Sequence, residues 1–453
     1  MDKLKIKKHK LNMTALIVIS FLTLIALGTL LLMLPISSAQ GKFTDPLTAG
    51  FTSVSATCVT GLVTVDTGSY WSFFGQAVIL LMIQIGGLGF MTFAVLAALL
   101  FGKVVTPRDR MLVAMSYNLN SYDSVTELVR RIALGTAFFE GVGALVLMTR
   151  FVPDFGARGV WISVFTSVSA FCNAGFDVFG NNFASLSAYA TDPVVNFTLM
   201  LLIMLGGIGF IVWSDTVNFI TKRKRLSVYS KLVLIISAIL VVGGTLLIAL
   251  FEWNNPDTIG NLPWYNKIMS SMFHSVTLRT AGFASFDNGL LTDGSVLISI
   301  LLMLVGGASG STAGGVKVVT AGVLMYTVMC VAVGKKEIFI FKRRLSKESF
   351  TKAVGIFVVQ LLLIIVGSCA ILATASEFDL TQVMYETASA VNTVGITMGI
   401  TTYLNAFSKI VIMFLMYFGR VGILTVTFAM SSGLARSSGN TSMTYPEANI
   451  LIG

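Results

Sequence analysis

The sequence predicts an all-α integral membrane protein made of four parallel helix–pore loop–helix repeats around a central pore, with eight transmembrane helices and four re-entrant pore helices. Three observations lead to this fold class: an apolar composition, basic segments that alternate with pairs of apolar runs, and a short motif that occurs four times. Of the 453 residues, 55% are hydrophobic and only 11% are charged, whereas about a quarter of the residues of a soluble protein are charged. Such a composition is typical of a chain that folds in a bilayer.

The basic residues indicate which connections face the cytoplasm. The formal net charge is +10, and 23 of the 31 lysines and arginines lie in five segments. These are residues 3–10, 103–131, 222–231, 335–352 and the position of Arg436. Because cytoplasmic loops carry an excess of Lys and Arg, the segments and both termini are predicted to be cytoplasmic. This distribution accounts for the charge without nucleic acid as a partner.

Two apolar runs, each long enough to span a bilayer at about 20 residues, separate one basic segment from the next. Each unit therefore crosses the membrane twice and returns to the cytoplasm. The first run, Met13–Leu34, is too long for a signal peptide and is predicted to be a retained helix. The expected organisation is a cytoplasmic N-terminal segment (1–12), repeat 1 (13–102), repeat 2 (126–222), repeat 3 (228–334), repeat 4 (349–434) and a C-terminal tail (435–453).

A semi-polar motif recurs once in each repeat. It reads TSVSATCVTGL, TSVSAFCNAGF, FHSVTLRTAGF and ETASAVNTVGI, and its last glycines are Gly61, Gly175, Gly282 and Gly395. Each motif follows about half the helical length that a span needs, so the chain is expected to enter and leave on the same side as a re-entrant pore loop. Non-helical backbone at that depth requires a water-lined or protein-buried position.

Four parallel copies place the glycines in one ring. Glycine admits the positive φ that turns successive carbonyls toward the axis, and a ring of carbonyls can replace the hydration shell of a monovalent cation. The negative ends of four half-helices favour positive charge at the same point, so no carboxylate is required. The candidate ion-coordinating residues are Val59, Thr60, Gly61, Asn173, Ala174, Gly175, Thr280, Ala281, Gly282, Thr393, Val394 and Gly395.

The second apolar run of repeat 3 contains the sequence GGASGSTAGGVK, from Gly306 to Lys317. Five glycines, each about 1 kcal/mol worse than alanine in a helix, predict a break in the span. The stretch is either a polar plug or a surface for close helix packing. Lys317 ends it and could extend to the cytoplasmic vestibule. Arg420 replaces the second glycine of a pair in repeat 4 and would lie at membrane depth, so it is either functional or held by a carboxylate or by carbonyls of the broken helix.

Three further polar residues lie near the motifs. Arg279 comes just before the third filter triplet and is expected to brace the loop from behind. His274 and Glu386 are expected to begin pore helices and to be structural or to line the mouth.

These residues resemble the Trk/Ktr/HKT superfamily of potassium transporters, most closely the membrane subunit of bacterial Ktr systems. The resemblance rests on the four loops, on Thr393-Val394-Gly395, which is similar to the TVG of potassium channels, and on the glycine pairs in GGLGF, GGIGF, GGASG and GRVGI. It covers essentially the whole chain. Since glycine at all four filter positions goes with potassium in this family, Gly61 implies potassium rather than sodium.

The resemblance also implies a gate, partners and a location. The broken helix would form an intramembrane gate, and Arg420 would contact it. A homodimer would sit in the bacterial plasma membrane on a cytosolic ring of nucleotide-binding RCK (KTN) subunits, with ATP and ADP acting through that partner and sodium promoting activity. The tail Tyr445–Gly453 would pack at the dimer interface, and Lys335–Arg344 either docks the ring or only sets topology. The implied gate residues are Gly306, Gly307, Ala308, Ser309, Gly310, Ser311, Thr312, Ala313, Gly314, Gly315, Lys317 and Arg420.

Other functional classes fit less well. The sequence has no GxxxxGK[ST] loop, and its glycine pairs lie within apolar helices rather than after a strand, so we expect no enzyme activity and no covalent cofactor. With two histidines, a proton relay is poorly supported. The alternatives are a sodium-coupled secondary potassium symporter with alternating access, which inverted repeats would favour, and a scaffold subunit with a dead pore, which would have lost filter glycines.

Overall fold

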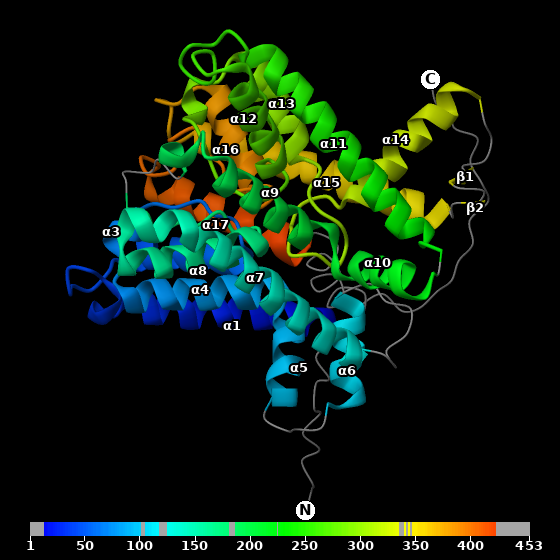
Figure 1. Cartoon of the computed structure of the whole chain (residues 1–453), viewed down its shortest axis with the longest axis horizontal. Coiled ribbons are helices and arrows are strands. Elements are labelled where there is room, and N and C mark those ends of the chain that lie inside the picture. Colours follow the sequence, from blue (N-terminus) through cyan, green and yellow to red (C-terminus); the bar gives the residue numbers. More distant parts are fainter. Residues whose placement is uncertain are drawn as a thin grey trace, which may run out of the picture.

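A computed structural model of the chain describes residues 13–100, 105–116, 125–180, 186–223, 225–334, 339–340, 343–344 and 347–422. The described part is helical except for a two-residue hairpin of β1 (Phe339–Ile340) and β2 (Arg343–Arg344). The tail at Tyr445–Gly453 and most of Lys335–Arg344 lie outside the described residues. Figure 1 shows the four repeats in sequence colours, from blue to red.

The helices follow the predicted order in each repeat. Repeat 1 holds α1 (Met13–Met33), η1 (Pro35–Ser37), α2 (Pro46–Cys58), α3 (Thr67–Tyr70), α4 (Phe73–Leu88) and α5 (Phe90–Leu100), and α6 (Pro107–Ser116) follows it. Repeat 2 holds α7 (Val125–Phe155), α8 (Ala157–Phe171), η2 (Ser187–Tyr189), α9 (Pro193–Ile208) and α10 (Phe210–Lys222). Repeat 3 holds α11 (Val228–Glu252), α12 (Trp264–Thr277), η3 (Asn288–Leu290), α13 (Asp293–Met303) and α14 (Val318–Ala332). Repeat 4 holds α15 (Lys347–Leu372), α16 (Leu380–Val391) and α17 (Ala406–Val421).

The first helix of each repeat is a continuous span. Helices α1, α7, α11 and α15 are long and apolar enough to cross a membrane. They expose large aliphatic side chains outward, such as Leu30 on α1, Leu145 on α7, Leu250 on α11 and Val366 on α15. Such an exposed apolar surface would be a liability in water and is the expected lipid-facing surface of a multi-pass membrane protein.

The second helix is interrupted in repeats 1, 2 and 3, whereas the sequence predicted a break only in repeat 3. Helices α4 and α5 meet at an angle of 105°, and α9 and α10 meet at 98°. The breaks fall at Gly89 and Gly209, and Gly422 ends α17 with the same backbone conformation, φ between 83° and 95°. Positive φ stops a right-handed helix. In repeats 1, 2 and 4 the helix therefore ends at the glycine three positions after the first residue of GGLGF, GGIGF or GRVGI.

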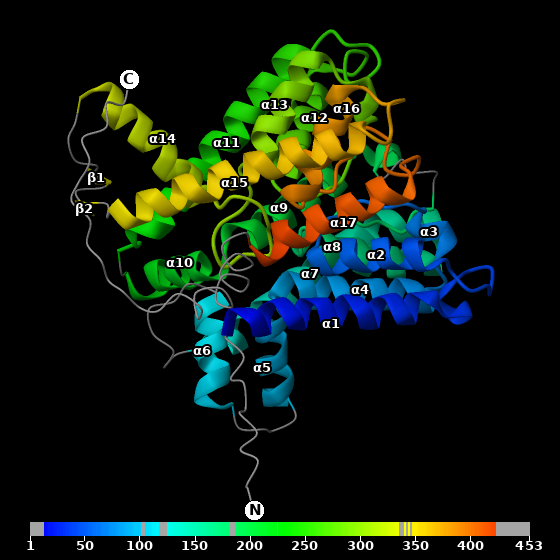
Figure 2. The ribbon, with the colours of Figure 1, turned by 180° about the vertical axis from the view of Figure 1, so that it is seen from behind.

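The repeats close into a ring because each second helix packs on the pore helix of the next repeat. The contacting pairs are α4 with α8, α9 with α12, α13 with α16, and α17 with α2. The last pair returns the end of the chain to its beginning, and Figure 2 shows α17 lying between α15 and α2. Helices α5 and α6 lie side by side and project away from the rest of repeat 1 (Figure 1). The four pore helices α2, α8, α12 and α16 are consequently enclosed.

Local sequence explains where these helices begin. Asp45 precedes Pro46, and its carboxylate accepts hydrogen bonds from the N–H groups of Leu47 and Thr48. Asp192 caps α9 before Pro193 in the same way. An acidic N-cap followed by proline satisfies free N–H groups and presets the first helical turn.

Candidate functional site: an axial ring of four pore loops

The four motif glycines lie in one closed ring. A Cβ placed on Gly61 would lie 2.4 Å from the carbonyl oxygen of Ala174, and one on Gly175 would lie 2.9 Å from that of Ala281. In the same cyclic order, a Cβ on Gly282 would lie 2.7 Å from Val394 O, and one on Gly395 would lie 1.9 Å from Thr60 O. Each glycine therefore meets the residue before the glycine of the next repeat. This cyclic order leaves no room for a side chain at any of the four positions.

Each loop contributes a triplet of residues that ends at its motif glycine. Within a triplet the backbone is left-handed at the first and third residues. The first residue of each triplet has positive φ (Val59 57°, Asn173 59°, Thr280 69°, Thr393 50°), and so does the third (98°, 69°, 82° and 90° at the glycines). Positive φ is unusual for any side chain and a true outlier for a β-branched one. Since the same departure occurs at four equivalent positions, the surroundings impose it.

The ends of the pore helices account for the first of these conformations. In repeats 1, 2 and 4 the middle residue of the triplet donates to the carbonyl five residues earlier: Thr60 N to Ser55 O, Ala174 N to Ser169 O and Val394 N to Ser389 O, each at 2.8 Å. This is the Schellman closure of a helix, in which the residue after the last turn is left-handed. The hydroxyl oxygens of Ser55 and Ser389 also accept from the N–H groups of Gly61 and Gly395, at 3.1 and 3.0 Å. The helix terminus itself thus shapes the loop.

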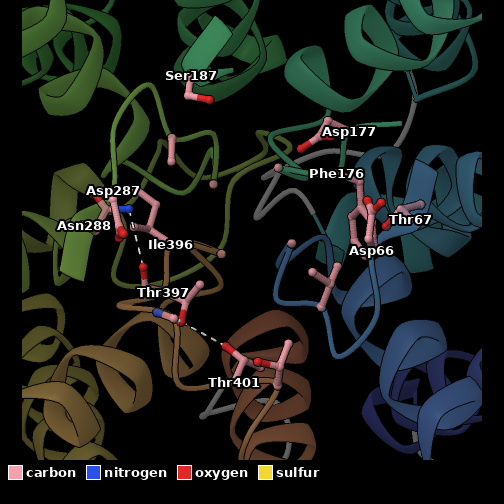
Figure 3. A pocket seen from close by; sticks show the side chains of 18 of the residues that line it. Asp66, Thr67, Phe176, Asp177, Ser187, Asp287, Asn288, Ile396, Thr397 and Thr401 are labelled. Carbon is pink, nitrogen blue, oxygen red and sulfur yellow. Dashed lines mark hydrogen bonds between the residues drawn. The ribbon is translucent and has the colours of Figure 1, made fainter. Parts of the chain in front are cut away.

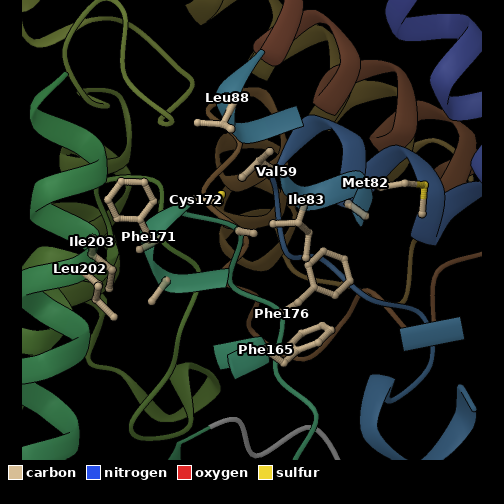
Figure 4. Close-up of a cluster of buried hydrophobic side chains, with 14 of the residues drawn as sticks. Val59, Met82, Ile83, Leu88, Phe165, Phe171, Cys172, Phe176, Leu202 and Ile203 are labelled. Atoms are coloured by element: carbon tan, nitrogen blue, oxygen red, sulfur yellow. The ribbon is translucent and has the colours of Figure 1, made fainter. Parts of the chain in front are cut away.

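The glycine pairs bring the second helices against the base of the ring. A Cβ on Gly86 would lie 2.1 Å from Thr57 O, one on Gly206 would lie 1.9 Å from Phe171 O, and one on Gly419 would lie 2.0 Å from Val391 O. These carbonyls end the pore helices. Figure 4 shows the buried side chains that surround this junction between repeats 1 and 2, including Phe171, Cys172 and Leu88. The first glycine of a pair is therefore required for close backbone approach.

The loop between α13 and α14 lies against one face of the ring, which is called the lower face; the opposite face is the upper one. Its ends run side by side, with Gly306 N donating to Val316 O at 2.9 Å and Val318 N donating to Gly307 O at 3.0 Å. A Cβ on Gly314 would lie 2.0 Å from Thr393 Oγ1. The break predicted in repeat 3 is thus present, and its residues Gly306, Gly307, Ala308 and Thr312–Gly314 are buried.

The same loop is hydrogen-bonded to repeat 2. Ala308 N donates to Gly207 O at 2.9 Å, and Thr312 Oγ1 donates to Phe171 O at 3.2 Å. In return Phe210 N donates to Gly310 O at 2.9 Å. These hydrogen bonds attach the loop to repeat 2, beside the end of its pore helix α8 and the break between α9 and α10.

The side chains of Arg420 and Lys317 both donate hydrogen bonds to carbonyl oxygens of this loop. The Arg420 guanidinium donates to Thr312 O of the loop, and to Gly86 O and Gly87 O of repeat 1 at 2.5 and 3.1 Å. Of the alternatives left open by the sequence, contact with carbonyls of the broken helix is present. Lys317 is half-buried, and its ammonium donates to Ala313 O at 2.7 Å. It folds back onto the loop rather than extending away from it.

Above the ring lies a cavity of about 490 Å³, shown in Figure 3. All four motif glycines line it, together with Asp66, Asp177 and Asp287. The sequence predicted a cation site without any carboxylate, so these three were not expected. The signal was present, because Asp66 and Asp287 each follow their motif glycine by the same offset. They cap the short helices α3 and η3 by accepting from Gly68 N and Gly289 N, at 3.2 and 2.9 Å.

Two sequence expectations near the mouth were wrong. His274 and Glu386 do not begin pore helices, because they lie in the second halves of α12 and α16. Glu386 is fully buried and accepts from the hydroxyls of Thr397 and Thr401, which line the cavity. The two pore helices begin earlier, at Trp264 after Pro263 and at Leu380 after Asp379.

Four re-entrant loops that meet in one ring, with the loop between α13 and α14 packed against them, define a four-repeat membrane protein with a central pore. The chain belongs to the TrkH family of cation transport proteins, whose family model matches residues 3–437.

Known relatives extend over nearly the whole chain. It is 39% identical to the Ktr system potassium uptake protein B of Bacillus subtilis over 439 residues, which cover 96% of this chain and 95% of the relative. It is 36% identical to the potassium/sodium uptake protein NtpJ of Enterococcus hirae, with 98% of each chain covered. The crystal structure of the potassium transporter TrkH from Vibrio parahaemolyticus matches with a TM-score of 0.72 at 17% identity, covering 94% of this chain and 86% of that one.

Proposed function

We propose that the protein takes up potassium by channel-like passage through the ring of four pore loops. The observation that carries the proposal is the repeated backbone conformation, left-handed at the first and third residues of all four triplets. A turn of this kind directs successive carbonyls toward one side, where they can replace the hydration shell of a cation. The names of the relatives, which refer to potassium uptake, favour potassium as the ion.

The selectivity filter in this proposal is the set of triplets that begin at Val59, Asn173, Thr280 and Thr393. The parallel repeats favour a pore over alternating access, since inverted repeats are typical of rocking transporters. Inward flux uses the membrane potential, which is worth about 2.3 kcal/mol per elementary charge per 100 mV. The competing function, sodium-coupled symport, predicts that potassium flux needs sodium on the same side.

The loop Gly306–Lys317 serves as the gate in this proposal, with Arg420 holding it closed. A guanidinium on Thr312 O places positive charge below the filter, where it repels cations until the loop moves. Opening requires the loss of the hydrogen bonds to repeat 2 and to Arg420. Each is worth about 1 kcal/mol net, and those to a charged group are worth more.

We further propose that the protein acts as a homodimer in a bacterial plasma membrane, with cytoplasmic termini, under the control of a cytosolic RCK (KTN) ring that binds ATP or ADP. Sodium would promote activity. The names of the relatives place them in a multi-component Ktr system. Residues 335–344 follow α14, so a partner bound there would act on the segment that leaves the gate loop.

The test is cation flux into liposomes that contain the purified chain. Potassium and sodium influx are compared for the unaltered protein and for a variant lacking Ala308–Ala313. Gly306 and Gly314 already touch, so the deletion can close without moving α13 and α14. We expect selective potassium flux that rises on deletion. Potassium flux that depends strictly on added sodium would favour symport, and selective flux unchanged by the deletion would contradict the gate.

A further inference from the structure

The residue immediately before each filter triplet lies at an equivalent position in the four repeats. These residues are Cys58, Cys172, Arg279 and Asn392. All four are buried. In three repeats the side chain at this position makes a polar contact with the first helix of its own repeat, α7, α11 or α15. The contact lies behind the filter, at the point where the pore helix ends and the left-handed residue begins.

In repeat 4 the contact is a buried pair of amides. Gln360 on α15 is 2% exposed, and its Nε2 donates to Oδ1 of Asn392, which is 0% exposed. The Asn392 Nδ2 donates in turn to Ala388 O of α16 at 2.8 Å. A Cβ on Gly315 of the gate loop would lie 3.2 Å from the same Asn392 oxygen. Gln360 therefore holds a residue that adjoins both the filter and the gate loop.

In repeat 2 the contact is a carboxylate network. The Cys172 thiol donates to Gln84 Oε1 of α4 at 3.4 Å and lies 3.8 Å from Glu140 Oε1 of α7. Gln84 Nε2 donates to Glu140 Oε2 at 3.3 Å. The main-chain carbonyl of Glu140 also accepts from Ser167 Oγ of the pore helix at 2.7 Å. Glu140 is thus attached to α8 at two points, one of them next to the triplet.

Repeats 3 and 1 complete the pattern. In repeat 3, Arg279 Nη1 donates to Ser237 O of α11 at 3.4 Å, the bracing contact expected from the sequence. In repeat 1, Cys58 lies in an apolar cluster with Phe51, Val54 and Leu62. Within the described residues no hydrogen bond joins Cys58 to α1. The filter is therefore braced by polar groups on three sides and by apolar packing on the fourth.

We propose that Glu140 and Gln360 are positioning residues that hold the filter of repeats 2 and 4 at the spacing that selects potassium. The proposal rests on the proposed function, because it assigns these residues to the same ring. Neither residue belongs to a triplet or to the gate loop. Each acts through the residue before the triplet, Cys172 or Asn392.

The physical basis is the cost of an unpaired polar group away from water. Without the polar atoms of Gln360, the buried Asn392 loses a hydrogen-bond partner. Without those of Glu140, the buried Cys172 and the half-buried Gln84 lose one. A buried polar group left unpaired is costly. Buried polar networks fix one arrangement of a core when every member is paired. Without the brace, the left-handed residue after the pore helix, already strained, can relax and move its carbonyl.

The experiment compares the potassium-to-sodium flux ratio of variants in liposomes. Gln360→Met and Glu140→Met keep side-chain length and remove the hydrogen bonds. Each is expected to lower the ratio about fivefold to tenfold, the factor that one buried hydrogen bond of about 1 kcal/mol carries, while total cation flux persists. Glu140→Gln keeps the polar contacts and is expected to retain the ratio.

The matched control is Ser368→Ala. Ser368 and Thr387 form a buried hydrogen bond of 2.7 Å between the same two helices, α15 and α16, away from the triplet. This variant loses a comparable contact and is expected to keep the ratio. Glu140→Met combined with Cys172→Ala is expected to lower the ratio no further than Glu140→Met alone, since both remove one network.

Three results decide the matter. Selective flux in the unaltered protein with an unchanged ratio in both methionine variants overturns the bracing proposal and leaves the proposed function standing. An equal loss in Ser368→Ala also overturns it, because the effect is then general to the helix pair. No selective flux in the unaltered protein overturns the proposed function and, with it, the brace. If Gln360→Met elutes as aggregate, the repeat 2 variants decide alone.

Discussion

Substitution of Gly61 by serine tests the ring geometry most directly. The Gly61 backbone has φ of 98°, and a Cβ there would lie 2.4 Å from the Ala174 carbonyl oxygen. Because real Cβ atoms essentially never come closer than 3.0 Å, that carbonyl must recede by about 0.6 Å (3.0 − 2.4). A left-handed conformation costs a non-glycine residue about 1–2 kcal/mol in addition.

The displaced atom is a proposed ion ligand of the neighbouring repeat, so the change reaches two of the four loops. Since 1.4 kcal/mol corresponds to a factor of ten, we expect Gly61→Ser to lower the potassium-to-sodium flux ratio about tenfold while the protein still folds. The assay is the initial rate of potassium and sodium influx into liposomes, measured on protein that elutes as a single peak. Gly141→Ser on α7 is the matched control, because a Cβ there meets nothing within 4 Å.

An unchanged flux ratio in Gly61→Ser would refute the reasoning, since the strained carbonyl would then not face the ion. A loss of the same size in Gly141→Ser would attribute the effect to serine in the membrane rather than to the ring.

Three further outcomes follow from the structure. Asp287→Asn keeps the side-chain oxygen that caps η3 and removes one negative charge from the cavity above the ring. The potassium concentration for half-maximal flux should therefore rise at low ionic strength, and the rise should be smaller at high ionic strength. Asp257→Asn, which is exposed and outside that cavity, should show no such rise. Arg420→Met removes the guanidinium from the gate loop, and potassium flux should rise as in the loop deletion; unchanged or lower flux would contradict a closing role. Gly206→Ala places a Cβ 1.9 Å from the carbonyl that ends the second pore helix, so its thermal midpoint in detergent should fall by several degrees, whereas that of Gly243→Ala, with nothing within 4 Å, should not.

The sequence located the elements that recur. Four copies of one motif predicted the pore loops, and the run Gly306–Lys317 predicted the break in repeat 3; both are present. These features are readable because they depend on local chemistry. Glycine breaks a helix wherever it clusters, and a span needs a fixed length of apolar residues. The same pattern did not reveal the bends at Gly89 and Gly209, because glycines in an apolar run also suit close packing of a continuous helix against its neighbour.

Only the tertiary structure determined which atoms meet. The contact of Gly395 with Thr60 joins residues from opposite ends of the chain, and the contacts of Arg420 with Gly86 and with the loop between α13 and α14 join three repeats. Asp66, Asp177 and Asp287 are far apart in sequence and line one cavity because their loops lie above the same ring. The left-handed conformation of Val59, Asn173 and Thr393 comes from the closure of a helix end, which residue type alone would have disfavoured. The sequence by itself thus determined the class of fold, the number of repeats and the position of the pore loops, since these follow from composition and periodicity. The register of the ring, the braces behind it and the charge above it depend on contacts between distant segments, and those exist only once the four repeats have packed.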